Sequence, residues 1–151
     1  MSVLVWNVRG LNKKVRRNDL KDQLHKWSPS LVGLVETKVK ENNSFRVTNC
    51  FPNNWQYMNN YTFSPRGRIW IVWDPACWTC QVISSSEQQI TITCQNRGGF
   101  QTHFSVIYGA NYHSQRLNLW KKLVDISSMI RDSALAVLGD FNSARFTCEK
   151  I

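Results

Sequence analysis

The stretch Ala136-Val137-Leu138-Gly139-Asp140-Phe141-Asn142 joins a short apolar run to a polar end. The apolar residues from 134 to 138 predict a buried strand, which Gly139 interrupts. Asp140 and Asn142 follow at once, and residues just past strand ends carry function more often than residues within strands. Gly, Asp and Asn are also ordinary turn residues, so this stretch alone supports a metal-assisted site and a plain turn about equally.

The composition indicates one globular domain with a basic surface. The chain has 151 residues, of which 42% are hydrophobic and 19% charged, and its net charge is +9. A basic surface favours polyanions such as nucleic acid, although it also attracts anionic membranes. The densest basic cluster, Lys13-Lys14-Val15-Arg16-Arg17, predicts either a phosphate-contacting patch or a solvated first helical turn.

Targeting signals and metal motifs are not evident in the sequence. No apolar run approaches the roughly 18 residues of a membrane span, and the first residues lack the basic region of a signal peptide. We therefore expect an intracellular protein. Five cysteines without framework spacing favour reduced thiols. The pair Cys77 and Cys80 has no second ligand pair, so we interpret this C-x-x-C as chance rather than zinc binding.

The first third of the chain predicts a strand, a helix and a second strand. The residues from 3 to 8 form the first apolar strand, which carries Asn7 near its end. A helix is expected from 15 to 27, with Leu20, Leu24 and Trp27 on one face. The apolar residues from 31 to 35 form a second buried strand that ends in Glu36. This order predicts a parallel pair with a crossover helix.

The middle of the chain predicts an antiparallel meander. The segment from 39 to 54 is polar and irregular. Short strands are expected at 55–60, 68–73, 78–84, 88–95 and 101–108. The residues from 89 to 94 alternate cleanly between apolar and polar, which is typical of a half-buried antiparallel strand. The turn from 96 to 99 predicts a hairpin.

A second long helix is expected from 116 to 131, before the final strand. Ser114 is its candidate N-cap. Its expected apolar face consists of Leu117, Trp120, Leu123, Val124 and Ile130. Strand–helix–strand units at both ends of an antiparallel meander predict an α+β fold in which two packed sheets are covered by helices.

Four strand ends carry polar residues that suit a metal and a phosphate. They are Asn7, Glu36, Tyr108 with Asn111, and Asp140 with Asn142. Magnesium prefers oxygen ligands, usually one or two carboxylates completed by water and substrate phosphate. Glu36 and Asp140 are suited to supply these carboxylates. The Asn and Tyr side chains are suited to hold phosphate oxygens or orient water without adding negative charge.

Four motifs in order resemble those of the endonuclease/exonuclease/phosphatase superfamily. They are Trp6 to Asn12, Leu34 to Thr37, Tyr108 to Asn111 and Leu138 to Asn142. The resemblance is nearest to the endonuclease domain of plant LINE-type, non-LTR retrotransposons, whose Gly-centred strand is similar to Ser64 to Trp73. It implies a DNase I-like four-layer α/β/β/α sandwich, cofactor Mg²⁺ or Mn²⁺, and DNA as partner.

The resemblance also implies roles for individual residues. Glu36 matches the metal-binding glutamate, and Asn7 matches the asparagine that helps hold metal and phosphate. Tyr108 and Asn111 match a phosphate-contacting pair, with Tyr108 counted among the catalytic residues. Asp140 and Asn142 match the pair that orients the attacking water and stabilises the phosphorane.

Two departures from the family pattern stand out. Arg9 occupies a position where apurinic/apyrimidinic endonucleases carry an aspartate. Nothing after Asn142 resembles the family's late Asp and Ser-Asp-His motifs, and His25, His103 and His113 do not fit them. Such domains run to roughly 200–250 residues. We therefore expect 1–151 to be the N-terminal part of a domain whose remainder, with a reverse transcriptase region, belongs to the parent protein.

These observations leave three hypotheses about function. The first is the N-terminal part of a metal-dependent DNA endonuclease, inactive alone and nuclear if retrotransposon-derived. The second is a non-catalytic remnant that binds nucleic acid without a positioned general base. The third keeps the fold but acts on other phosphoesters, since fold does not fix function. Nucleic acid would be bound by the basic residues Arg9, Lys13, Lys14, Arg16, Arg17, Arg66 and Arg68.

Overall fold

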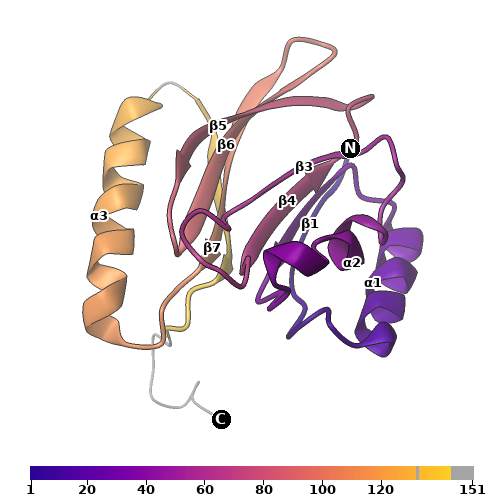
Figure 1. Cartoon of the computed structure of the whole chain (residues 1–151). Coiled ribbons are helices and arrows are strands. Elements are labelled where there is room, and N and C mark those ends of the chain that lie inside the picture. Colours follow the sequence, from indigo (N-terminus) through magenta and orange to yellow (C-terminus); the bar gives the residue numbers. More distant parts are fainter. Residues whose placement is uncertain (132, 144–151) are drawn as a thin grey trace.

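Two four-stranded sheets lie face to face, with helices on their outer sides (Figure 1). This arrangement comes from a computed structural model, which describes residues 1–131 and 133–143. One helix, drawn in orange, stands outside one sheet, and the N-terminal helices stand outside the other (Figure 1). Helices on both outer faces of two packed sheets confirm the expected α+β sandwich.

The first sheet has the order β1-β2-β4-β3. Its strands are β1 (Val3–Asn7), β2 (Leu31–Val35), β3 (Gln56–Asn59) and β4 (Ile69–Trp73). β1 and β2 are parallel, and Asn7 is paired with Val35 at their ends. The crossover between them is α1 (Lys14–Trp27), as the strand–helix–strand pattern predicts.

The outer face of this sheet packs against α1 and two short helices, η1 (Glu41–Asn43) and α2 (Phe45–Thr48). Leu20 of α1 and Val47 of α2 are buried in one apolar cluster with Trp70 of β4. The segment from 39 to 54 was expected to be irregular and instead contains these two helices. Val47 explains the difference, because a single buried residue anchors α2 without an apolar repeat long enough to predict a helix.

The second sheet has the order β5-β6-β7-β8. Its strands are β5 (Trp78–Ser85), β6 (Gln89–Asn96), β7 (Gln101–Tyr108) and β8 (Leu135–Asp140). The first three are antiparallel neighbours. β7 and β8 are parallel and are joined by α3 (His113–Met129), so a second strand–helix–strand unit closes the described chain.

The core between the sheets is built from their inner faces. Ile71 of β4, Ile92 of β6 and Val106 of β7 belong to this cluster. Gly33 of β2 allows the sheets to approach, since a Cβ at this position would lie 2.9 Å from Val106. No helix within the described residues is long and apolar enough to cross a membrane.

Details of both long helices differ from expectation. α3 begins at His113, and its N-cap is Tyr112 without a side-chain capping bond, so Ser114 is not the cap. Its buried residues are Arg116, Leu119 and Ile126, whereas the expected face residues Leu117, Trp120 and Val124 are exposed. The other two expected residues, Leu123 and Ile130, are half-buried on the stripe of Leu119 and Ile126, so the expected face mixed the buried stripe of α3 with an exposed one. In α1, Trp27 is exposed, because it lies in the last turn with its indole bonded to Gln23.

Candidate active site

The ends of four strands meet at one edge of the sandwich. β1 and β2 end side by side in the first sheet, and β7 and β8 end side by side in the second. The two pairs are joined across the sheets, where Asn7 Nδ2 donates to Asp140 Oδ2 at 2.8 Å. The two residues are separated by 133 positions in the chain, so this bond is made by the fold rather than by a local turn.

Asp140 is the centre of a hydrogen-bonded loop after β8. Its Oδ1 accepts from the Asn142 backbone N–H at 2.9 Å. Asn142 Nδ2 in turn donates to the Gly109 carbonyl at 2.6 Å, and the Gly109 N–H donates to the Asp140 carbonyl at 2.8 Å. These three hydrogen bonds fix the positions of Asp140 and Asn142, two of the residues that the sequence predicted for the site.

Glu36 directly follows β2, and its carboxylate is mostly buried and ionised. Its Oε1 lies 2.5 Å from Lys38 Nζ, and its side chain is 17% exposed. Burial raises the pKa of Glu36, but hydrogen bonds from Lys38 and Asn7 and the positive charges of Lys38 and Arg9 outweigh it, so the pKa is lowered. Asn7 thus connects both candidate metal-binding carboxylates.

Tyr108 ends β7 beside Asp140, its partner in the β7–β8 ladder. The Arg68 guanidinium lies 5.7 Å from the centre of its ring. Burial raises the pKa of Tyr108, and the charges of Glu36 and Asp140 raise it further against the opposing effect of Arg68 and Lys38. The phenol therefore stays protonated and can donate a hydrogen bond at neutral pH.

Backbone strain is concentrated at this edge. Among the described residues, five non-glycine residues have positive φ, and four of them follow the strand ends: Arg9, Glu36, Lys38 and Asn142. The fifth, Ser28, is the C-cap of α1. Such conformations cost free energy and persist where the surroundings impose them, often at functional sites.

Gly139 allows β8 to continue in the sheet and so to place Asp140 at the strand-end edge. Its φ is +137°, and a Cβ there would meet the Ile107 carbonyl oxygen of the neighbouring strand. Any side chain would therefore collide with backbone that cannot move without breaking the ladder. The glycine that interrupts the apolar run is required by the sheet and not by a surface turn.

The other predicted phosphate-binding residues are divided between the edge and its surroundings. Arg9 is exposed and lines an open hollow with Asn7, Asp140 and Asn142. Asn111 is exposed and lies in a neighbouring hollow with Arg68 and Gln88. The structure thus brings Asn7, Glu36, Tyr108, Asp140 and Asn142 together, and Asn111 lies beside them.

The basic cluster at 13–17 lies at the start of α1, away from these carboxylates. Lys13 is the N-cap position, and Arg16 is paired with Asp19 at 3.6 Å. Arg17 Nη1 donates to the carbonyls of Leu11 and Asn12, and Lys14 and Arg17 both line a separate pocket. Arg66 is exposed and lies in a shallow hollow with Lys40 and Glu41.

Sequence reasoning missed three residues that shape the edge. Lys38 neutralises Glu36, Gln88 accepts the Ala110 N–H at its side-chain oxygen, and Arg116 donates to the carbonyls of Ala110 and Asn111. Lys38 lies two residues after Glu36, and its positive charge was the only feature of the sequence that could have indicated this ion pair. Gln88 comes from another part of the chain, so its contact could not be inferred from spacing.

No histidine is among the described residues that line the hollow with Asn7, Asp140 and Asn142. His25 is in the last turn of α1 and His113 begins α3. His103 lies at the opposite end of β7 from Tyr108, hydrogen-bonded to Thr93. Among residues 1–131 and 133–143, no three His, Cys, Asp or Glu side chains are grouped closely enough to hold a metal by themselves.

Comparison with known proteins gives a structural match and no sequence match. No family model matches the chain, and no curated protein matches it. The human Nocturnin catalytic domain with bound sulfate is 16% identical, covers 92% of this chain and has a TM-score of 0.61. A D. rerio TDP2 humanized by 14 mutations is 14% identical, covers 96% and has a TM-score of 0.64.

A third match carries a family name. The endonuclease/exonuclease/phosphatase family protein from Bacteroides thetaiotaomicron is 12% identical over 93% of this chain, with a TM-score of 0.67. The chain spans 64%, 63% and 62% of these three proteins in turn. Identities this low show shared architecture alone. The chain therefore has the DNase I-like sandwich fold of the endonuclease/exonuclease/phosphatase proteins.

Proposed function

We propose that this chain supplies the metal- and phosphate-binding part of a phosphodiesterase site that acts on DNA. The observation that carries the proposal is the Asn7–Asp140 hydrogen bond, which joins the ends of the two sheets and, through Asn7, reaches the ionised Glu36. Structural likeness to nuclease- and phosphatase-type proteins supports the same chemistry.

The donor set at the edge fits a hard divalent cation. Glu36 and Asp140 offer two carboxylates and Asn7 a carboxamide, and Mg²⁺ commonly takes one or two carboxylates with water and substrate phosphate. The low pKa of Glu36 keeps it in the form that binds metal. When bound, the ion would polarise the phosphoryl oxygens and neutralise charge that develops on them.

The remaining residues bind and orient the substrate. The protonated Tyr108 hydroxyl donates to a phosphate oxygen, and the amide of Asn7 can do the same once it turns from Asp140. Asp140 accepts a hydrogen bond from the attacking water and so orients it for in-line attack. Asn142 fixes the position of the Asp140 carboxylate through its backbone N–H. Preorganised donors and acceptors of this kind are usually the largest contribution to catalysis.

The charge around the edge favours a polyanion over a small phosphoester. Arg9 lies in the same hollow as Asn7 and Asp140, Lys38 contacts Glu36, and Arg68 covers Tyr108. Phosphate contacts of this type supply affinity that falls with salt. The motif resemblance to LINE-type endonucleases supports DNA as substrate and a retrotransposon-type parent protein, which would act in the nucleus.

Metal binding tests the proposal without requiring turnover. Mn²⁺ titration followed by electron paramagnetic resonance should show one site in the wild type. Glu36→Gln should weaken that binding at least tenfold, because a carboxylate ligand becomes a neutral amide. Asp74→Asn, which removes a carboxylate far from the edge after β4, is the matched control. Equal Mn²⁺ affinity in all three proteins would contradict the proposal.

A second candidate function is nucleic-acid binding without cleavage. It is favoured by the lining of the hollow that holds Asn7, Asp140 and Asn142, since its described residues include no histidine to act as general base. A supercoiled-plasmid nicking assay with Mg²⁺ or EDTA decides between the two. Binding without nicking by folded protein supports the second candidate for this chain alone. Nicking that Glu36→Gln and Asp140→Asn both abolish would show that the site is complete.

A further inference from the structure

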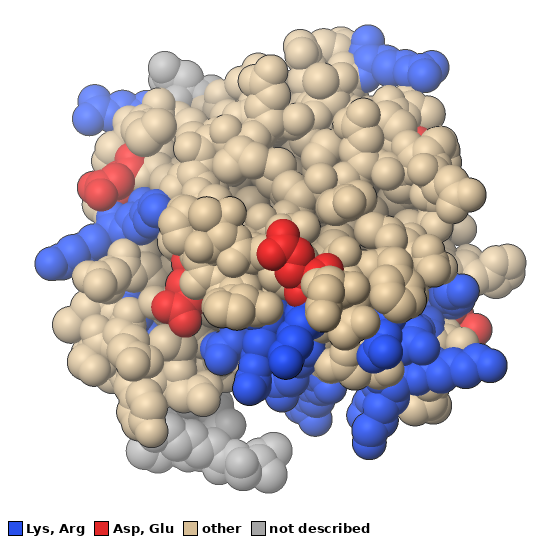
Figure 2. Space-filling view, in the orientation of Figure 1, with Lys and Arg blue, Asp and Glu red and all other residues tan. Residues whose placement is uncertain are grey.

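A basic pocket lies between α1 and α2, outside the first sheet. Its cationic residues are Lys14, Arg17, Lys21 and Arg46, and Asn12, Asn18, Asn49, Phe45 and Cys50 complete the lining. No carboxylate is among these residues. Lysine and arginine side chains gather along the lower edge of the face seen in Figure 2, below the region where Figure 1 places α2.

The cations of this pocket are free to bind a ligand. Among the described residues, Lys14, Lys21 and Arg46 form no ion pair, whereas nearby Arg16 is paired with Asp19. Arg17 and Arg46 each use only Nη1 in hydrogen bonds within the described chain, to the Asn12 region. Unpaired positive charges held this close repel one another, and an anion in the pocket relieves that repulsion.

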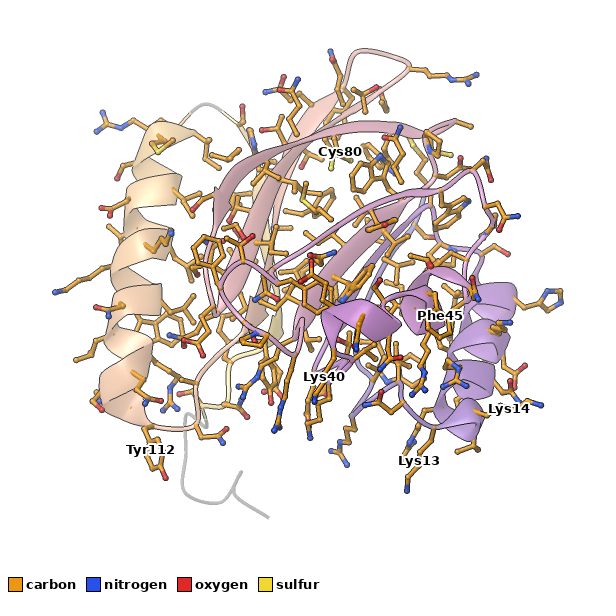
Figure 3. All side chains as sticks on the ribbon, viewed as in Figure 1. Lys13, Lys14, Lys40, Phe45, Cys80 and Tyr112 are labelled. Atoms are coloured by element: carbon orange, nitrogen blue, oxygen red, sulfur yellow. The ribbon has the colours of Figure 1, made fainter. Side chains whose placement is uncertain are left out.

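Phe45 adds an aromatic surface to the same pocket. Phe45 is 52% exposed, so its ring is accessible to a ligand. The Arg46 guanidinium lies 6.0 Å from its ring centre. Figure 3 shows Phe45 on α2 and Lys14 at the beginning of α1, on the same side of the molecule. Cations beside an exposed aromatic ring suit a phosphate joined to a base.

Asn12 connects this pocket to the strand-end edge. Its Nδ2 donates to the Lys38 carbonyl at 2.8 Å, and its Oδ1 accepts from Arg46 at 3.4 Å. Lys38 in turn contacts Glu36. The loop that ends β1 therefore has the candidate metal-binding carboxylate on one side and the basic pocket on the other.

We propose that the α1–α2 pocket binds one nucleotide of an unpaired nucleic-acid strand, with the phosphate on Lys14, Lys21 and Arg46 and the base stacked on Phe45. An unpaired strand is required, because a base within a duplex has no free face to offer Phe45. The inference deepens the proposed function by adding a strand-binding subsite beside the edge. It requires neither metal nor hydrolysis, so it can fail or hold independently.

Fluorescence anisotropy with a labelled single-stranded oligonucleotide in EDTA tests the proposal. The double variant Lys14→Ala/Lys21→Ala should weaken binding and reduce the slope of log affinity against log salt by up to about 0.7, the contribution of one phosphate contact to a single strand. Both lysines are exposed, so the variant should fold. The control, Arg97→Ala/Lys121→Ala, removes the same charge from the β6–β7 turn and α3.

The aromatic part has its own test. Phe45→Ala should weaken binding of the oligonucleotide about tenfold, whereas Phe45→Tyr should preserve it. An abasic oligonucleotide of equal length, which keeps the phosphates, should bind wild type and Phe45→Ala alike. Loss of affinity for the abasic strand in Phe45→Ala would overturn the stacking role.

Two further results would overturn the site. Equal effects of the pocket and control double variants would show general electrostatic attraction rather than a pocket. Tighter binding of duplex than of single strand, with both weakened by the lysine variant, would assign the patch to a duplex backbone. A preference for the single strand that disappears in Phe45→Ala supports the proposal, whatever the outcome of the metal and nicking experiments.

Discussion

The molecule contains two parallel strand–helix–strand units, β1–α1–β2 and β7–α3–β8, one in each sheet. Both use an arginine in the same way. Arg17 Nη1 donates to the carbonyls of Leu11 and Asn12, and Arg116 Nη1 donates to those of Ala110 and Asn111. Each arginine thus ties the loop after the first strand to the helix, using carbonyls six and five residues earlier.

The units differ in how their parts are buried. All five residues of β2 are buried, whereas β8 is half-buried along most of its length. Both helices bury apolar side chains, Leu20 in α1 and Leu119 with Ile126 in α3, but α3 also buries the charged Arg116. The two units therefore differ mainly in the burial of their second strands and in the burial of this arginine.

The largest expected effect comes from replacing a glycine in each unit. Gly139→Ala should destabilise the protein by about 4 kcal/mol, because strain from its positive φ adds to a collision with the Ile107 backbone. Gly33→Ala should cost about 1.5 kcal/mol, since the atoms nearest to its Cβ belong to the side chains of Val106 and Val5 and not to the backbone. Urea unfolding measures both. A larger loss for Gly33→Ala would show that the sheet interface is less tolerant than the β8 backbone.

Leucine truncations test which stripe of α3 packs on the sheet. Leu119→Ala should cost about 3 kcal/mol, as Leu20→Ala should in α1, because each removes a buried side chain and leaves a cavity. Leu117→Ala in α3 should cost less than about 1 kcal/mol, since that residue is 47% exposed. Thermal melts of the three variants give the comparison. Similar losses for Leu117→Ala and Leu119→Ala would contradict the burial of the Leu119 stripe.

Removal of the arginine should destabilise the protein more in the second unit than in the first. Arg116→Ala should cost about 2 kcal/mol, because Arg116 is 7% exposed and its loss leaves two loop carbonyls without their donor. Arg17→Ala should cost about 1 kcal/mol, since water can reach the half-exposed loop. The lysine variant at each position, which keeps the charge, is the control. Full recovery by lysine would show that charge alone is needed.

Most strands could be predicted from the sequence because their patterns are local. The residues 31–35 and 101–108 were expected as strands, and β2 and β7 have these bounds. Alternation between 89 and 94 predicted the antiparallel pairing of β6. The expected half-burial was wrong, because five of these six residues are buried, in a sheet that has the first sheet on one face and α3 on the other (Figure 1). The buried face of α3 could not be predicted, because apolar residues occur on two stripes and the loop before the helix decides which one meets the sheet.

The sequence predicted which strand ends form the candidate site, but not the hydrogen bonds and ion pairs that connect their side chains. Parallel pairing brings Tyr108 beside Asp140, as two adjacent strand ends should. The Asn7–Asp140 bond depends on how the two sheets stack, and sequence spacing contains no such information. The bond between Gln88 and Ala110 is also non-local, since 22 positions separate the two residues. The contact of Lys38 with Glu36 is local but depends on the positive φ of both residues, which residue spacing does not predict.

The smallest expected effect is a pH dependence specific to the second unit. His103 is buried on β7, and burial lowers its pKa below 6.5. As pH falls through 6.5, the unfolded chain takes up a proton more readily than the folded one, so stability should decrease until the folded pKa is reached. His103→Gln should remove this decrease, and His25→Gln, at an exposed position of α1, should retain it. Urea midpoints measured from pH 7.5 to 5 give the comparison, and a decrease that persists in His103→Gln would assign it to another group.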